Sequence, residues 1–404
     1  MPDKNITFID NVEIKNKRIL LRVDFNVSLT LQNQIADDAR IQQALPTINH
    51  LLKNGNKLIL VTHFGRPKGR DEKLSNKVVA DRLQGYLPTY KVKLINDFLT
   101  ENKETFVNQK EDEIFMLENI RFYPEEKKND PQFAAKLAAL ADVYVNDAFG
   151  VSHRADASIV GVPTTMKGDK SMPSYGGLLL KRETEMISKA INNPRKPMVA
   201  IIGGAKISNK ISLIGRLMEI ADYLIVGGGL ANTFLAAQGF NIGKSICEHE
   251  ELDNARRLFF NAAQKHTTIQ LPVDVIVGTG LQDTNSVVKK IEDVTETDFI
   301  LDIGPETQAK YSTIIAPAKT IVWNGPVGYF ENPVFRRGTD FIYYAIAHNN
   351  GSTLSIVGGG DTLAAISKKE YLDHITHIST GGGAMLEFIE KGTLPGIEAL
   401  KKTS

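Results

Sequence analysis

Two lysines that follow a pair of glycines are the residues whose spacing most directly suggests chemistry. The stretch MVAIIGGAKISNKI at residues 198–211 reads as a buried apolar strand, then Gly203-Gly204, then a polar helical run. Lys206 and Lys210 are four residues apart, so both would lie on one face of the first helical turns. Cations are unfavourable there unless an anion lies between them, and a helix start offers free N–H groups to an anion. The stretch predicts either a phosphate site or a plain strand–helix turn with two solvated lysines.

A second candidate is VGGGDT at residues 357–362, a strand that runs through a glycine turn into a helix start. Asp361 and Thr362 are both good helix N-caps, which is the purely structural interpretation. The functional interpretation is that Asp361 holds Mg²⁺ on bound phosphates while Thr362 and adjacent N–H groups contact phosphate oxygens.

In the first half, the polar residues that follow predicted strands are mostly basic. Each alone could be a solvated cation, but ligands of parallel sheets bind at the carboxyl ends of strands. Arginine suits carboxylate and phosphate oxygens, and Asp24 and Asn26 add acceptors for hydroxyl groups. The pattern predicts a basic bowl for a small, hydroxylated polyanion. The basic residues are Arg40, His63, Arg66, Arg121, His153 and Arg154.

Strands and helices alternate along the chain, which indicates an α/β fold with mostly parallel sheets and helices on both faces. At 404 residues the chain exceeds what one hydrophobic core usually supports, so two Rossmann-like domains are expected. The predicted strands are 18–23, 57–62, 91–95, 113–117 and 143–145 in the first half, and 198–202, 223–226, 273–277, 298–302, 320–323, 353–357 and 374–378 in the second.

A Gly-, Pro- and Ser-rich stretch at residues 161–177 is the best boundary candidate. We expect a first domain at 1–175, an interdomain helix at 176–193 and a second domain at 194–387. The tail at 388–404 is expected to pack on the first domain.

Composition limits the class of partner and compartment. The net charge of +1 gives no general attraction to nucleic acid or membrane. The single cysteine, Cys247, permits no internal disulfide and fits a reducing, cytoplasmic compartment. The first residues lack the apolar core of a signal peptide, and no apolar run approaches the length of a membrane span.

Other motifs argue against alternative chemistries. GFNIGKS at 239–245 resembles a P-loop, but its first glycine is one residue too close and it follows a helical run. The triple glycines do not form the dinucleotide fingerprint, so a nicotinamide cofactor is weakly supported. No His/Cys cluster has metal-ligand spacing, and no G-x-S-x-G elbow occurs.

Taken together, these motifs closely resemble the phosphoglycerate kinase family, over nearly the whole chain and in family order. The resemblance implies a 3-phosphoglycerate domain, then a domain for Mg-ATP or Mg-ADP, in a monomer that closes by hinge bending. The matching motifs are RVDFNV (22–27), THFGRP (62–67), LENIRF (117–122), NDAFGVSHR (146–154), GGAKISNKI (203–211), VGGGLANTF (226–234), IGPET (303–307), VWNGPVGYFE (322–331), GGGDT (358–362) and STGGGA (379–384).

The resemblance also implies roles for individual residues. Contacts to phosphoglycerate fall on Asp24, Phe25, Asn26, Arg40, His63, Phe64, Gly65, Arg66, Arg121 and Arg154. Contacts to the nucleotide fall on Lys206, Lys210, Gly304, Asn324, Glu331, Gly359, Gly360, Asp361 and Thr362. The catalytic set is Arg40, Lys206, Gly360 and Gly382, with Asp361 on the metal.

The sequence departs from the family pattern at three positions: Ser28 replaces a common proline, Phe64 a common leucine and Asp156 a common histidine. None removes an implied ligand, so they concern fine tuning. Thr393 stands at the family's late hinge position, and hinge residues are expected around 175–193 and 392–396.

The implied reaction is reversible transfer of a phosphoryl group between ATP and the carboxylate of 3-phosphoglycerate, which gives 1,3-bisphosphoglycerate and ADP. The nucleophile is already ionised, so no general base is needed, which fits the absence of a catalytic carboxylate pair or triad motif. Three alternatives stay open: a nicotinamide-dependent dehydrogenase, a non-catalytic nucleotide-binding protein, and a phosphotransferase for a different carboxylate.

Overall fold

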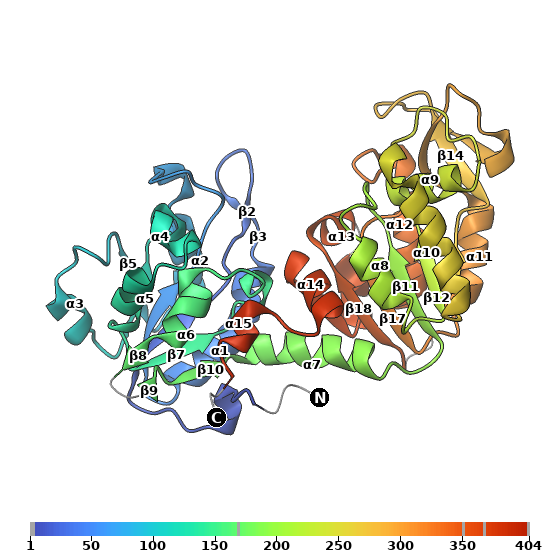
Figure 1. Cartoon of the computed structure of the whole chain (residues 1–404). Coiled ribbons are helices and arrows are strands. Elements are labelled where there is room, and N and C mark those ends of the chain that lie inside the picture. Colours follow the sequence, from blue (N-terminus) through green and yellow to red (C-terminus); the bar gives the residue numbers. More distant parts are fainter. Residues whose placement is uncertain (1–4, 168–169, 350–351, 367–368, 402–404) are drawn as a thin grey trace. The chain divides into compact units, whose positions relative to one another are not determined.

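The computed structural model describes residues 5–167, 170–349, 352–366 and 369–401, which belong to two compact units (Figure 1). Unit 1 comprises Met1–Glu185 and Thr393–Ser404, and unit 2 comprises Met186–Gly392. The first division point lies inside the interdomain helix expected at 176–193, and the second lies after the expected boundary at residue 387. The first falls inside the long helix α7 (Leu178–Asn192).

Unit 1 is built on a six-stranded parallel sheet in the order β10-β7-β1-β4-β6-β5. The register places Arg22 of β1 opposite Val61 of β4 and Asn146 of β7, so these strands end at the same level. The strands are β1 (Arg18–Arg22), β4 (Lys57–Val61), β5 (Lys91–Ile95), β6 (Glu113–Leu117), β7 (Val143–Asn146) and β10 (Ser174–Gly176). The last lies in the stretch that was expected to be a domain boundary.

Helices connect these strands, and two short antiparallel ribbons add to them. The helices are α1 (Ala39–Leu52), α2 (Lys77–Tyr86), α3 (Lys103–Val107), α4 (Pro124–Lys127), α5 (Pro131–Ala138), α6 (Val162–Thr164) and α15 (Pro395–Glu398). The ribbons are β2 (Ser28–Leu29) with β3 (Ile35–Asp37), and β8 (Met166–Lys167) with β9 (Lys170–Ser171). Single turns are η1 (Ile9–Asn11), η2 (Glu72–Leu74), η3 (Ile120–Phe122), η4 (Phe149–Val151) and η5 (Ala157–Gly161).

Unit 2 repeats the design with a parallel sheet in the order β13-β12-β11-β17-β18-β19. Its strands are β11 (Met198–Ile202), β12 (Tyr223–Val226), β13 (Thr268–Gln270), β17 (Thr320–Asn324), β18 (Leu354–Gly358) and β19 (His377–Ser379). Its helices are α8 (Ile211–Leu217), α9 (Gly228–Ala237), α10 (Leu252–Gln264), α11 (Pro305–Ile315), α12 (Arg337–Ala347), α13 (Gly360–Ala365) and α14 (Gly383–Lys391). Single turns are η6 (His249–Glu251), η7 (Ile291–Asp293), η8 (Pro333–Phe335) and η9 (Lys369–His374).

Two strands that the sequence placed in the simple alternation form a separate antiparallel sheet in the order β15-β14-β16. They are β14 (Asp274–Gly278) and β16 (Phe299–Ile303), joined by β15 (Val287–Lys290). Apart from this addition, the α/β fold with two largely parallel sheets is confirmed.

The central strands are apolar on both faces because helices flank the sheets, as a parallel sheet requires. Leu21 and Leu60 are fully buried in unit 1, and Ile201 and Trp323 are fully buried in unit 2. Among the described residues, no helix combines the length and apolarity that crossing a membrane demands.

Candidate functional site

The basic residues of unit 1 follow strands that end at one edge of its sheet. Asp24 follows β1, His63 follows β4, Arg121 follows β6 and Arg154 follows β7. Arg40 joins them from the first turn of α1. The common level of the strand ends therefore brings the predicted residues to one face, which we call the basic face.

A buried carboxylate lies at the centre of the basic face. Asp24 forms an ion pair with Arg40, and its Oδ1 lies 3.8 Å from Nδ1 of His63. Burial alone would raise the pKa of Asp24, but the positive charges of Arg40 and Arg22 lower it below its ordinary value. Burial lowers the pKa of His63 well below its ordinary value, so His63 is neutral at pH 7. The 3.8 Å contact is accordingly neither a salt bridge nor a hydrogen bond.

The loop after β4 carries His63, Phe64, Gly65 and Arg66, and hydrogen bonds hold it in place. Gly65 donates its N–H to Oδ1 of Asn26 at 2.8 Å and accepts from Nη1 of Arg121 at 3.1 Å. Phe64 is buried, whereas the side chain of Arg66 is exposed to solvent. The loop thus presents a cation on a fixed backbone.

Positive charge accumulates on this face beyond what its carboxylates balance. Burial and the charges of Arg22 and Arg154 lower the pKa of Arg121 to about 10. Asp156, 4.0 Å from Arg121, opposes this shift. Arg22, fully buried behind the face, donates from Nε to the hydroxyl of Ser158 at 2.8 Å. An anion on this face would relieve the mutual repulsion of the arginines.

Unit 2 has a cavity of about 490 Å³ at the carboxyl ends of its strands. The register keeps these ends level, because Ile202 lies opposite Val226 and Asn324, and Asn324 lies opposite Gly358. Its lining includes an apolar wall with Val275, Phe299 and Leu301, together with Gly204, Gly228, Glu331 and Asp361.

The two lysines of the opening motif are not on a helix, so that prediction is wrong. Residues 203–210 form turns, and α8 begins only at Ile211, with Lys210 as its N-cap. The cause is the buried carboxylate of Glu248, which accepts from the N–H groups of Ile207 (2.5 Å) and Ser208 (3.0 Å) and from the Ser208 hydroxyl (2.6 Å). These bonds fix the turn at 207–208 on a carboxylate from outside the segment.

The two lysines have different environments. Lys206 is exposed, whereas Lys210 donates to the carbonyl of Gly203 at 2.6 Å and to Oδ1 of Asn324 at 3.0 Å. Burial lowers the pKa of Lys210 to about 8, and the charge of Asp361 opposes this shift. Lys210 is therefore poised to gain charge when an anion approaches.

One glycine and two polar side chains fix the turn that leads into α13. Gly359 has φ of 111°, a conformation that favours glycine. Asn324 donates from Nδ2 to the carbonyl of Gly358 at 2.7 Å. The Thr362 hydroxyl donates to the same carbonyl at 2.9 Å and accepts from Gly325 N–H at 2.7 Å. The Thr362 side chain is thus engaged within the protein, and Asp361 is exposed at the cavity.

The sequence matches the family model "PGK: Phosphoglycerate kinase" over residues 9–392. The chain belongs to the phosphoglycerate kinase family. It is 47% identical to phosphoglycerate kinase of Dictyoglomus turgidum over 403 residues, which cover 99% of this chain and 100% of that one. It is 44% identical to the enzyme of a Nostoc species, with 99% of both chains covered.

Solved structures agree with this assignment. Phosphoglycerate kinase from Coxiella burnetii matches with a TM-score of 0.86 at 42% identity, and the one from Pyrococcus horikoshii matches with 0.84 at 31% identity. Each match covers 98% of both chains.

The residues present fit the magnesium ion that the sequence predicts. Kinases commonly hold Mg²⁺ with one or two carboxylates plus substrate phosphates, without a protein cage. Asp361 is such a carboxylate at the cavity. Within the described ranges no group of three or more His, Cys, Asp or Glu could hold a metal alone.

Other predicted residues lie at the cavity's margin or away from it. Gly304 is the N-cap of α11, donates its N–H to the carbonyl of Asp274 at 2.9 Å and does not line the cavity. Gly382 is the N-cap of α14. Lys244 and Ser245 of the rejected P-loop resemblance do line the cavity wall, but they follow no parallel strand and form no phosphate loop.

Sequence reasoning missed the buried residues that anchor the candidate site of each unit, chiefly Asn119 in unit 1 and Glu248 in unit 2. In the sequence, Asn119 stands out only as part of the LENIRF motif, and nothing near Glu248 marks it. A buried acceptor far along the chain leaves no local spacing signal, so only the structure reveals its partners.

Proposed function

We propose that the basic face of unit 1 binds 3-phosphoglycerate and that the cavity of unit 2 binds ATP or ADP. As a member of the phosphoglycerate kinase family, the chain is a phosphotransferase that moves a phosphoryl group between ATP and 3-phosphoglycerate in glycolysis. The observation that carries the site assignment is the separation of chemistries: cations gather at one sheet edge of unit 1, and a half-apolar, glycine-lined cavity lies at the equivalent edge of unit 2.

On the basic face, arginines would hold the two anionic ends of phosphoglycerate. Arg66 and Arg154 are exposed and have guanidinium groups that match phosphate oxygens. The ionised Asp24 accepts a hydrogen bond from the substrate hydroxyl. Asp24 also pairs with Arg40, and we expect the Arg40 guanidinium to point to the reacting carboxylate. Neutral His63 and Asn26 complete the polar contacts, and buried Phe25 and Phe64 support the backbone.

In unit 2, the apolar wall would pack against the nucleotide base, and Glu331 would contact its sugar. The phosphates would lie toward Lys206, Lys210 and the N–H groups of 359–362, where a helix start favours negative charge. Gly304 and Asn324 support this surface, Asn324 through its bond to Lys210.

The chemistry then depends on placement and charge, since the attacking carboxylate is already ionised. Arg40 and Lys206 neutralise the phosphoryl group in transfer, and the N–H groups at Gly360 and Gly382 donate to its oxygens. Mg²⁺ on Asp361, when bound, would neutralise the nucleotide phosphates. Because the two ligands bind different units, transfer requires a conformation in which they meet, and exclusion of water then prevents hydrolysis.

A coupled assay with 3-phosphoglycerate, ATP and Mg²⁺ tests this assignment. We expect Arg40→Ala and Lys206→Ala each to lower kcat by about two to four orders of magnitude. Arg66→Ala should mainly raise the KM for phosphoglycerate, and Arg257→Ala on the exposed side of α10 is the matched control. Wild-type-like turnover by Arg40→Ala or Lys206→Ala would remove those residues from the mechanism, and a panel of other carboxylates tests the substrate.

We also propose that the protein is a monomer in the cytoplasm, as expected for a glycolytic enzyme of this family. Light scattering after size-exclusion chromatography would give one chain's mass of 44.6 kDa if this is correct.

A further inference from the structure

One buried side chain links the separate parts of the basic face. The amide of Asn119, fully buried after β6, makes four hydrogen bonds: three to the segment that follows β4, and one to Arg121 in the turn that Asn119 itself caps. Its Oδ1 accepts from Phe64 N–H (3.1 Å) and Arg121 N–H (3.1 Å). Its Nδ2 donates to the carbonyls of Phe64 (2.6 Å) and Leu74 (2.8 Å). The amide therefore uses both donors and accepts two bonds, which leaves none of its hydrogen-bonding capacity idle.

These bonds pair the backbone of Phe64 at a point where β4 and β6 no longer pair with each other. β4 ends at Val61 and β6 ends at Leu117, yet Phe64 still has both its N–H and its carbonyl paired, by the Asn119 amide. Beyond Phe64 the chain leaves the sheet and returns near Leu74. Asn119 thus holds both ends of the 64–74 excursion, the segment that carries Arg66. Through its bond to Arg121 N–H, it also fixes the position of this segment relative to Arg121.

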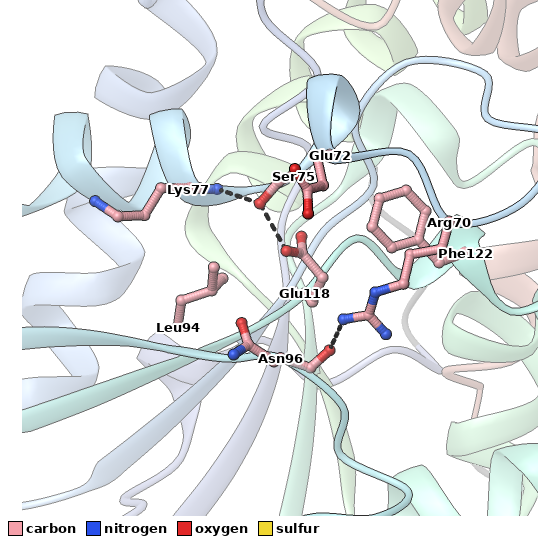
Figure 2. Close-up of a pocket in the computed structure, with 8 residues that line it drawn as sticks. All are labelled: Arg70, Glu72, Ser75, Lys77, Leu94, Asn96, Glu118 and Phe122. Carbon is pink, nitrogen blue, oxygen red and sulfur yellow. Dashed lines mark hydrogen bonds between the residues drawn. The ribbon is translucent and has the colours of Figure 1, made fainter.

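The neighbouring residue secures the returning chain (Figure 2). Oε2 of Glu118 accepts from the Ser75 hydroxyl at 2.6 Å, and Oε1 accepts from Asn76 N–H at 2.7 Å and from Asn119 N–H at 2.7 Å. Ser75 and Glu118 line a pocket of about 480 Å³, and Figure 2 shows their side chains facing each other. Arg70 and Glu72 of the 64–74 excursion line the pocket, and the bonds of Glu118 and Asn119 attach the end of this segment to the residues after β6.

We infer that Asn119 is a positioning residue for phosphoglycerate binding: its amide sets the placement of the 63–66 loop relative to Arg121. The inference rests on the proposed assignment of the basic face as the phosphoglycerate site. Asn119 acts only through the residues it holds, since its side chain is buried and its amide is fully engaged within the protein. A displacement of about 1 Å in such ligand groups is enough to cost a large factor in turnover or affinity.

The informative variant is Asn119→Asp, which preserves shape but turns the donor toward Phe64 and Leu74 into an oxygen. The ionised carboxylate would repel both carbonyls and push the loop away from Arg121. We expect the KM for 3-phosphoglycerate to rise by about 10- to 100-fold at neutral pH, while the KM for ATP changes less than about threefold. Lowering the pH toward protonation of the new carboxyl should partly restore the KM, because its O–H can donate again.

The matched control is Asn56, an equally buried amide at the opposite edge of the same sheet. Its Oδ1 accepts from Lys17 N–H at 2.9 Å, and its Nδ2 donates to the carbonyls of Ile14 (2.8 Å) and Leu51 (2.9 Å). Asn56→Asp should lower the urea midpoint comparably and leave the KM for 3-phosphoglycerate within about twofold of wild type, since it touches no part of the loop.

The inference is overturned if folded Asn119→Asp keeps a wild-type KM for phosphoglycerate, if its two KM values rise equally, or if Asn56→Asp raises the phosphoglycerate KM as much. Should Asn119→Asp fail to fold, Asn119→Ser is measured against Asn56→Ser with the same criteria. Failure of the proposed function is distinguishable, because wild type would then show no phosphoglycerate-dependent turnover.

Discussion

Two adjacent glycines at the start of α13 should respond in opposite ways to one added methyl group. Gly359 has φ of 111°, and a Cβ there would lie 2.5 Å from Nδ2 of Asn324 and 2.9 Å from the Thr362 hydroxyl oxygen. A Cβ on Gly360 would meet no atom within 4 Å. Gly359→Ala should therefore destabilise unit 2, and Gly360→Ala should not.

The magnitude follows from backbone strain and from displaced hydrogen bonds. A non-glycine residue in an unfavourable backbone region costs about 1–3 kcal/mol. Asn324 is buried and bonded to both Gly358 and Lys210, so it cannot swing away without losing bonds of about 1 kcal/mol each. Gly359→Ala should thus cost about 3 kcal/mol. With a urea slope of about 1–3 kcal/mol per M, the midpoint should fall by about 1–3 M.

The chain contains one tryptophan, Trp323, which is fully buried beside Asn324 in β17. Its fluorescence therefore reports the unfolding of unit 2 specifically. Gly360→Ala is the control and should match or slightly exceed wild type, because alanine is a better helix former than glycine. Equal midpoints for the two variants would refute the argument that the glycine conformation and the Asn324 contact hold this turn.

Three further predictions concern buried charges in unit 2. Phosphates near Lys210 should raise its pKa from about 8, so calorimetry at pH 8.5 in two buffers should show uptake of about half a proton or more on ADP binding, and none for Lys210→Arg. Burial raises the pKa of Asp302 to about 8. The stabilising effect of protonated Asp302 is therefore present below pH 4 and is lost as pH rises toward 8. In urea titrations, the free energy of unfolding gained by Asp302→Asn should grow by about 1 kcal/mol per pH unit between pH 5 and 8. A pH-independent difference between the variant and wild type would contradict this. Glu248→Ala should lower kcat by about 10- to 100-fold by releasing the turn beside Lys206, whereas exposed Glu250→Ala should not; equal rates would argue against this role.

The sequence was sufficient for the parts of the fold that local periodicity and strand-end chemistry determine. Residues 198–202 were predicted as a buried strand and form β11, and the cations predicted to follow strands do share one sheet edge. Both successes have one cause: in a parallel sheet, the residue after each strand is placed by the register of the strand itself.

The failures arise where distant residues override local preference. The helical expectation for 203–210 was wrong because Glu248, far along the chain, binds the N–H groups of Ile207 and Ser208. The strand β10 was hidden in a Gly- and Pro-rich stretch because its partner, β7, lies elsewhere in the sequence. β14 and β16 pair antiparallel although their apolar patterns resemble those of the parallel strands. Local patterns carry no information on these partners.

The arrangement of charge on the basic face explains why it needs buried restraints. The arginines there repel one another, and the pKa of Arg121, lowered to about 10, records that repulsion together with the cost of burial. Without fixed attachment, Arg66 and its loop would relax outward and lose their convergence on one point. Asn119, Asn26 and the Asp24–Arg40 ion pair oppose that relaxation, because each ties a charged or loop residue to the sheet. The repulsion is thereby retained in the free protein and relieved when an anion binds, so that part of the binding free energy comes from charges that folding has already brought together.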